Sequence, residues 1–416
     1  MRILIATDAF PPGSGGSGWS TYELAKGLRA RGHEIFIVQP YSESSPVPGG
    51  YDGFRVSGYS ARAPRVPFLR NYFRNERLYP RLARHLAKVI ETERIELIHA
   101  QHVLTAPAAV IAARHARIPS VCTVRDYWPL CYWSDLLVDP ERGSVCSGCS
   151  ASAMTRCIRP RARTVWPAAI PLIPYMRANL RLKQSSLARA DAIVAVSHRV
   201  AADLRRHASD LVHSRIETIP NGVDVSAIRA AAKVSSSPTG QPYALFVGKL
   251  AKNKGAHLLV DIAERASLQM PLVAVGDGPE RRAIEEAAIA AKRDVRVVGW
   301  QSRDEVFRWM HHAAVLIFPS NCLETLSRVL IEASALGVPI AAMNTGGTED
   351  IVVNEATGLL STSVAALAAD VVRLTGDADL RARLAERAAA RAQTEFDLPV
   401  VVSRMEKLYR DLVHGS

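Results

Sequence analysis

The sequence predicts an α/β protein with two doubly wound parallel sheets, one in each half of the chain. Short apolar runs rich in β-branched residues recur between longer segments with helical periodicity, and these runs lack the strict polar alternation of half-exposed strands. The 416 residues exceed the about 100–200 of a usual single domain. With 48 % hydrophobic and 22 % charged residues, the composition is globular and excludes a disordered or fibrous chain.

The expected strands fall into two series. The first series is Arg2–Thr7, Glu34–Val38, Glu96–Ala100, Ser120–Val124 and Ala192–Val196. The second series is Tyr243–Val247, Leu272–Val275, Val295–Val298, Ala314–Phe318 and Pro339–Ala342. Helical periodicity lies between them, for example at Ser20–Arg31, Lys254–Ala266 and Leu326–Leu336. Strands that alternate with helices in this way form parallel sheets through βα units.

Two domains and a terminal helix follow from this order of elements. We expect a first Rossmann-like domain at residues 1–200 and a second at 215–395, because the turn signal Ile219-Pro220-Asn221-Gly222 separates the two series. At 399–416, apolar residues share one face of a helix. We expect this helix to cross back to the first domain, with capping of the second domain as the alternative.

The charge balance favours anionic partners. There are 52 Lys and Arg against 40 Asp and Glu, a formal net charge of +12. Residues 62–88 and 156–183 interleave these cations with aromatic and aliphatic side chains, a pattern typical of an anionic membrane surface. A solvated face and nucleic acid are the alternatives, and we do not expect nucleic acid. Because no apolar run approaches about 20 residues, we expect a cytoplasmic protein, on the inner face of the membrane if it binds lipid.

A glycine-rich loop follows the first strand. The segment Pro11–Gly18 formally contains G-x-G-x-x-G, but Gln39 stands where a dinucleotide site would need an acidic residue, and no G-K-[ST] follows. Ligands of open α/β sheets bind at the carboxyl ends of the strands. We therefore expect a substrate-facing loop, with Gly15 and Gly16 on the donor and Gly18 on the acceptor side. A plain flexible loop is the alternative.

Two lysines open the second domain. Lys249 follows its first strand, and Lys254 is expected at the start of the next helix, so both ammonium groups could enter one crevice and compensate a diphosphate. Two carboxylates, Glu324 and Glu332, stand eight residues apart further along the chain. That spacing suits a loop residue that reaches a sugar and a helix residue that reaches a ribose.

The start of that helix is expected to face the phosphates. The amides concerned belong to Leu326, Ser327 and Arg328. Unpaired amides and the helix dipole favour an anion there, by about 0.3–1 kcal/mol. For any single one of these residues, a solvated lysine or a surface ion pair is the simpler interpretation.

Four of the six cysteines fall within one insert, at about 126–163. Cys146 and Cys149 form a CxxC pair, and Cys131 and Cys157 flank it. Four thiolates are enough for a structural zinc ion at about 2.3 Å. We expect zinc, with free thiols and disulfides as alternatives.

Taken together, these segments resemble the retaining glycosyltransferases of family four, which have the two-domain GT-B fold. The resemblance spans nearly the whole chain, and its motifs are specific only as an ordered set. They are Pro11-Pro12 with Gly15-Gly16, Arg31-Gly32-His33-Glu34, Ile219-Pro220-Asn221-Gly222-Val223-Asp224, Gly248-Lys249 with Lys254-Gly255, Val275-Gly276-Asp277-Gly278-Pro279, Glu324 with Glu332, and Gly346-Gly347. The cysteine insert is similar to one in a branch of the family.

The resemblance implies a role for each matched position. Lys249 and Lys254 would bind the donor diphosphate, and Val298-Gly299 would lie beside the base. Glu332 would hold the ribose and Glu324 the transferred sugar. The leaving phosphate would take the acceptor proton, so that no cofactor is required for chemistry.

This chain departs from the family pattern at three places. Lys249 replaces the usual Arg and lacks its bidentate fork, and Thr325-Leu326-Ser327 replaces a glycine-containing stretch. Arg125 stands where a histidine is frequent. It cannot act as a base, but with Asp126 it could hold the acceptor or the leaving phosphate. His102 is expected to face the cleft on the acceptor side. A surface ion pair and a structural histidine are the respective alternatives.

We therefore expect a retaining hexosyltransferase. Its donor would be a nucleotide-diphosphate sugar, a UDP-sugar rather than a GDP-sugar. Its acceptor would be a glycan, a lipid-linked sugar or a small molecule, in cell-envelope or polysaccharide biosynthesis. The alternatives are a sugar-nucleotide epimerase of the same fold and a non-catalytic nucleic-acid-binding protein.

Overall fold

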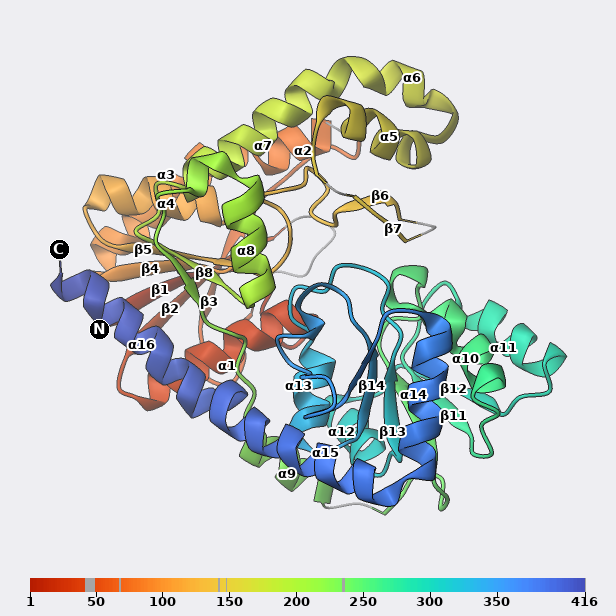
Figure 1. The fold of residues 1–416 in the computed structure, drawn as a ribbon. Helices are drawn as coiled ribbons and strands as arrows, with labels where there is room; N and C mark the ends of the chain where they lie inside the picture. Colours follow the sequence, from red (N-terminus) through yellow and green to blue (C-terminus); the bar gives the residue numbers. More distant parts are fainter. Residues whose placement is uncertain (42–48, 67–68, 141–142, 147, 234–235, 416) are drawn as a thin grey trace.

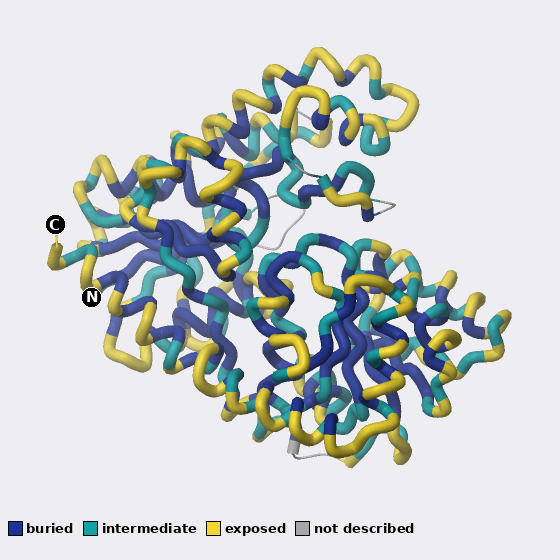
Figure 2. Tube along the Cα trace, in the orientation of Figure 1, coloured by how far each residue is buried: buried dark blue, intermediate teal, exposed yellow. Residues whose placement is uncertain are grey.

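The computed structural model contains two α/β domains with a parallel sheet in each (Figure 1). It describes residues 1–41, 49–66, 69–140, 143–146, 148–233 and 236–415. Buried residues concentrate along the strands of both sheets, and exposed residues lie on the outer faces of the helices (Figure 2). None of the helices in these ranges combines the length and the apolar character needed to cross a bilayer.

The first sheet has seven strands in the order β3-β2-β1-β4-β5-β8-β9. Their bounds are β1 Arg2–Ala6, β2 Glu34–Tyr41, β3 Val56–Ser60, β4 Leu97–Ala100, β5 Ser120–Val124, β8 Ala192–Ala195 and β9 Ile216–Thr218. Successive β1 side chains enter different cores: Leu4 packs with α3 (Leu78–Thr92) and α4 (Ala106–Ala116), and Ile5 with α1 (Gly16–Ala30) and α16 (Leu398–His414). Burial on both faces explains why these strands read as continuous apolar runs.

The second sheet has six strands in the order β12-β11-β10-β13-β14-β15. Their bounds are β10 Ala244–Val247, β11 Leu272–Val275, β12 Val295–Gly299, β13 Val315–Phe318, β14 Ile340–Met343 and β15 Leu359–Ser361. The helices of this domain are α9 Val225–Lys233, α10 Leu259–Arg265, α11 Arg281–Ala290, α12 Arg303–His311, α13 Arg328–Ala335, α14 Val364–Gly376 and α15 Ala378–Arg391. The prediction of a two-domain α/β protein with parallel sheets is thus confirmed.

Strand order reverses once in each sheet, between β1 and β4 and between β10 and β13. Such a reversal leaves a crevice beyond the carboxyl ends of the two strands, where open α/β sheets bind ligands. The segments that follow these four strands carry Lys249, Lys254, Glu324, His102 and the glycine-rich loop.

Two elements lie differently from the expectation. β9 pairs with β8, so the first sheet runs beyond residue 200 and includes residues that we expected in the second domain. The expected helix Lys254–Ala266 is instead two 3₁₀ turns, Lys252–Lys254 and Ala256–Leu258, followed by α10. Gly255 divides the turns, with φ +71°.

The terminal helix α16 leaves the second domain and runs along the first (Figure 1). Glu406 accepts hydrogen bonds from Arg31 at 2.8 Å and pairs with His33 at 2.9 Å. Tyr409 hydrogen-bonds to the buried His99 of β4. Helix α16 therefore continues the chain of the second domain and packs against the first.

The cysteine-bearing insert stands on the first domain with a small core of its own. It contains the hairpin β6 (Leu137–Asp139) and β7 (Ser144–Val145) and helix α5 (Ala151–Ala162), and it packs against the helices that follow it, α6 (Trp166–Ala169) and α7 (Ile173–Leu187). Side chains from this segment, Met154, Ile158 and Met176 among them, form the core. Helix α8 (His198–His207) then returns the chain toward the second domain (Figure 1).

Candidate active site

The second-domain loops bring Lys254 and Glu324 into contact. The ammonium Nζ lies 2.7 Å from Glu324 Oε1, and the carboxylate is buried. Burial works against the charge of Lys254, but the Glu324 carboxylate outweighs it and raises the pKa of the lysine. Ser320 also donates to Glu324, at 2.5 Å. The two residues therefore form one charged unit at the β10–β13 crevice.

Close packing of two loops creates this contact. A Cβ on Gly255 would overlap the carbonyl oxygen of Pro319, so glycine allows the loop after β10 to lie on the loop after β13. Lys249 leaves the end of β10, is exposed, and makes no ion pair with the residues that the structure describes. The structure thus holds one of the two lysines against the acid and leaves the other in solvent.

Helix α13 begins at Arg328, with Ser327 as its N-cap. The Ser327 side chain does not cap the helix, so the first amides of α13 are not satisfied by it. Leu326 and Ser327 are both buried immediately before the helix. Thr325 donates a 2.7 Å hydrogen bond to the carbonyl oxygen of Arg125 in the first domain. The start of α13 therefore sits at the boundary between the domains.

A cluster of four charged residues spans this boundary. Glu23 of α1 accepts hydrogen bonds from Arg303 at 2.6 Å and from Arg328 at 2.8 Å. Arg328 Nε also donates to Glu332 at 2.7 Å, and Arg303 lies 3.5 Å from the same carboxylate. Burial disfavours the guanidinium charge, but Glu332 and Glu23 together raise the pKa of Arg328. Glu332, expected at the ribose, is thus held in place by Arg328.

The expected base-binding segment ends strand β12. Val298 is half-buried, and Gly299 is buried with φ +77°. Trp300 follows with 78 % of its surface exposed. Arg281 lies close to Gly299 on the side where a Cβ would project.

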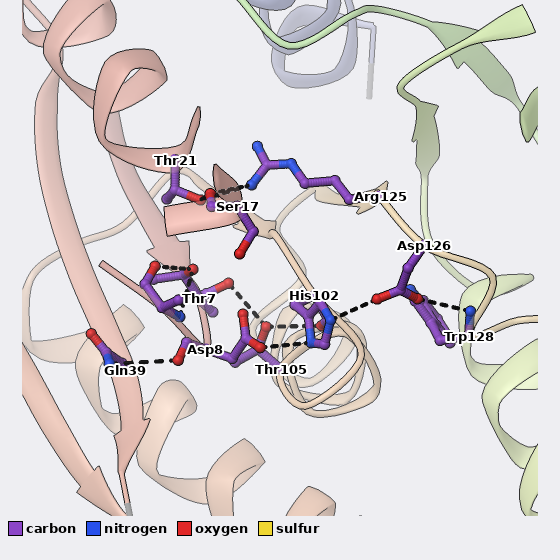
Figure 3. Close-up of polar contacts among 12 residues, drawn as sticks. Thr7, Asp8, Ser17, Thr21, Gln39, His102, Thr105, Arg125, Asp126 and Trp128 are labelled. Carbon is purple, nitrogen blue, oxygen red and sulfur yellow. Dashed lines mark hydrogen bonds and ion pairs between the residues drawn. The ribbon is translucent and has the colours of Figure 1, made fainter. Parts of the chain in front are cut away.

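On the first-domain side, His102 lies between two carboxylates (Figure 3). Its Nδ1 is 2.9 Å from Asp8, and its Nε2 is 2.8 Å from Asp126. Burial disfavours the imidazolium, but the two acids outweigh it and raise the pKa of His102 to about 10. This histidine is therefore charged at neutral pH and cannot accept a proton from an acceptor.

Arg125 points to helix α1 rather than to Asp126 (Figure 3). Its Nη1 donates to the carbonyl oxygen of Ser17 at 3.0 Å and to Thr21 at 2.8 Å. Burial lowers the pKa of Arg125 to about 10, which leaves it charged at neutral pH. The Arg125–Asp126 partnership considered above is replaced by contacts to α1, and the acid pairs with His102 instead.

The glycine-rich segment is more helical than expected. Helix α1 begins at Gly16, with Gly15 as its N-cap, so only Pro11–Gly15 form the loop. Gly16 faces the Arg328 side chain, and Gly18 is buried in the first turn against Ser14. Gly18 thus packs closely against Ser14, and its expected place on the acceptor side stays a prediction.

The four insert cysteines lie near one another. All are free thiols, and the environment of Cys149 includes the other three. Burial raises the pKa of Cys149 to about 12 and raises those of Cys131 and Cys157. Across the described ranges, no group of three or more His, Cys, Asp or Glu side chains is arranged to hold a metal ion. The zinc ion expected from the cysteine spacing therefore stays a prediction.

Three site residues escaped the sequence analysis, namely Asp8, Glu23 and Arg303. Asp8 and Arg303 follow strands β1 and β12 in chain order, so the rule that ligands bind beyond strand ends could have singled them out. Glu23 lies inside a helix, and no local pattern marks it.

Two parallel-sheet domains that face a shared boundary, with a lysine and two glutamates at the second-domain crevice, define the GT-B class of glycosyltransferases. Residues 14–227 match the model of Glycosyltransferase Family 4, and residues 228–391 match that of Glycosyl transferases group 1. The chain belongs to glycosyltransferase family 4.

Known proteins agree with this assignment. The chain is 35 % identical over 126 residues to the 2-deoxystreptamine N-acetyl-D-glucosaminyltransferase of Niallia circulans, a match that covers 29 % of this chain and 32 % of that protein. It is 26 % identical to the glycogen synthase of Mycobacterium tuberculosis over 100 % of this chain and 96 % of that one. It is also 26 % identical to the GDP-mannose-dependent alpha-mannosyltransferase of Mycolicibacterium smegmatis, over 86 % and 84 % of the two chains.

Solved structures share the fold across the whole chain. Sucrose-phosphate synthase from Thermosynechococcus elongatus superposes with a TM-score of 0.72 at 21 % identity and covers 100 % of both chains. HepE from Anabaena, solved in complex with UDP, superposes with a TM-score of 0.70 at 19 % identity and covers 99 % of this chain and 100 % of its own.

Proposed function

We propose that this protein transfers a hexosyl group from a nucleotide-diphosphate sugar to an acceptor with retention of configuration. The observation that carries the proposal is the Lys254–Glu324 pair beside the start of α13. A cation and unpaired helix amides suit a diphosphate, and a buried carboxylate suits sugar hydroxyls. Glu332 would bind the ribose hydroxyls, and the segment at Val298 would lie beside the base.

The proposed reaction needs no side-chain base. The bond from the anomeric carbon to the diphosphate breaks, and the acceptor oxygen bonds to that carbon from the same face. The acceptor proton passes to the leaving phosphate oxygen. Negative charge grows on the diphosphate, where Lys254, Lys249 and the α13 amides would stabilise it. The charged state of His102 agrees with this scheme, because it cannot serve as the base.

The donor is proposed to be a UDP-sugar. HepE was solved with UDP and with UDP-glucose, although the mannosyltransferase relative is GDP-mannose-dependent. A thermal-shift comparison of UDP, GDP and ADP tests this choice, and stabilisation by GDP alone would refute it. Nuclear magnetic resonance of the product with each donor tests retention; inversion at the anomeric carbon contradicts the proposal. Conversion of the donor without any acceptor would instead indicate an epimerase.

We further propose that the enzyme acts at an anionic membrane surface, on a glycan or lipid-linked acceptor. Exposed Val66, Leu69 and Tyr72 lie in sequence beside exposed Arg65 and Arg70. Apolar side chains with flanking cations suit such a surface. Sedimentation with vesicles that contain phosphatidylglycerol tests this. We expect binding that falls with added salt, and equal binding to neutral vesicles would contradict it.

A further inference from the structure

A cavity lies between the cysteine insert and helices α7 and α8. It encloses about 380 Å³, within the about 300–1,000 Å³ of small-molecule sites. Its walls come from the insert (Leu136, Cys146 and Cys149), from α7 and from α8. Leu323, which precedes Glu324, also lines it. The cavity therefore reaches the residue that precedes Glu324 in the chain.

The polar lining of this cavity is dominated by cations. The cations are Arg177 and Arg181 of α7 and Arg199 of α8, whereas Asp203 is the one acidic side chain of the lining within the described ranges. Asp203 is already engaged by Arg199 at 2.9 Å. The Asp203 carboxylate thus compensates the guanidinium of Arg199, and no carboxylate of the described lining is left for Arg177 and Arg181.

Arg177 and Arg181 lie four residues apart on one face of α7. Both are exposed, and neither makes an ion pair with any residue described in the structure. Like charges at this spacing repel one another in a helix. The Cys149 thiol in the lining adds no negative charge, because burial raises its pKa to about 12. An incoming anion would relieve this repulsion.

We propose that this cavity binds an oxyanion carried by the acceptor, a phosphate or a carboxylate group. Arginine forks match both groups, and the position beside Leu323 would direct the rest of the acceptor toward Glu324. That the anion belongs to the acceptor rests on the function proposed above. The existence of the anion site rests only on the cavity and its charges.

The test uses the full chain saturated with UDP, so that the donor site is occupied. Glucose 1-phosphate, glucuronate and glucose are titrated by calorimetry at low ionic strength. We expect at least one of the two anions to bind about tenfold more tightly than glucose, and the stronger anion identifies the source of the oxyanion. Arg177→Ala/Arg181→Ala should weaken that binding at least about tenfold and leave UDP affinity unchanged.

The matched control is Arg206→Ala/Arg383→Ala, which removes two exposed arginines outside the cavity and should leave anion binding within about twofold of the wild type. Equal binding of glucose and the anions, or unchanged anion binding by the cavity variant, would overturn the inference. Failure of UDP to bind counts against the proposed function instead. In that case anion binding is compared between the wild type and the cavity variant without UDP. Weaker anion binding by the cavity variant supports the anion site, and unchanged anion binding overturns it.

Discussion

Lys254 is the residue on which the chemistry depends most. Replacing it with alanine removes a cation from the proposed leaving group and leaves the buried Glu324 carboxylate without its ion pair. We expect Lys254→Ala to lower kcat by about a hundred- to a thousandfold, or about 2.7–4 kcal/mol. Lys252→Ala, an exposed neighbour on the same turn, is the control and should retain activity. Equal turnover of the two variants in a UDP-release assay would contradict the role of Lys254.

His102 makes stability depend on pH. Its folded pKa of about 10 lies above its ordinary value of 6.5, so its contribution is complete below about pH 6.5 and disappears as pH rises through 10. We expect the wild-type free energy of unfolding to fall over this window more steeply than that of His102→Gln. Urea unfolding at pH 6.5 and 9.5 measures the two slopes; parallel slopes would show that the Asp8 and Asp126 contacts do not stabilise the charged form.

At the scale of elements, the contact of α1 with α16 leaves no room at Gly27. A Cβ there would overlap Val402 of α16. Alanine in a helix normally stabilises by up to about 1 kcal/mol relative to glycine, but here we expect Gly27→Ala to destabilise by about 1–3 kcal/mol. Gly376→Ala, at a helical glycine with open space around it, should be neutral or stabilising. Thermal denaturation compares them, and a stabilised Gly27→Ala would mean that the helices lie further apart.

The elements themselves could largely be predicted from the sequence, and the reasons for the exceptions are physical. Strands buried on both faces, such as β5 and β11, can be recognised in the sequence as apolar runs. The three-residue β9 and β15 are too short for a periodicity to show. The stretch after Lys254 carries helical periodicity, but Gly255 adopts a left-handed φ and breaks it into short turns.

At the scale of the molecule, the cluster of Glu23, Arg303, Arg328 and Glu332 holds the domains together. Glu23→Gln would leave two partly buried guanidinium groups with one carboxylate, at a cost of up to about 3–5 kcal/mol. We expect small-angle scattering of this variant to give a larger radius of gyration than the wild type. Glu34→Gln, which removes an exposed acid within the first domain, should not change it. An unchanged radius of gyration for Glu23→Gln would show that other contacts hold the two domains together.

Contacts between the domains are also what the sequence could least reveal. Lys254 and Glu324 lie in the segments that follow strands β10 and β13, Glu332 lies inside α13, and their ordered motif marked all three. Glu23 and Arg328 stand 305 positions apart in the chain, and only the folded molecule shows that they pair. Local pattern therefore predicts which residues occupy each crevice but not how the crevices face one another.

The central claim is that a nucleoside diphosphate binds at the start of α13, against Lys254. Hydrogen–deuterium exchange with and without UDP tests it most directly, because it locates the bound nucleotide along the chain. We predict slower exchange at residues 248–256, 297–301 and 324–332. Protection confined to the first domain, or an exchange pattern that UDP does not change, would contradict the account.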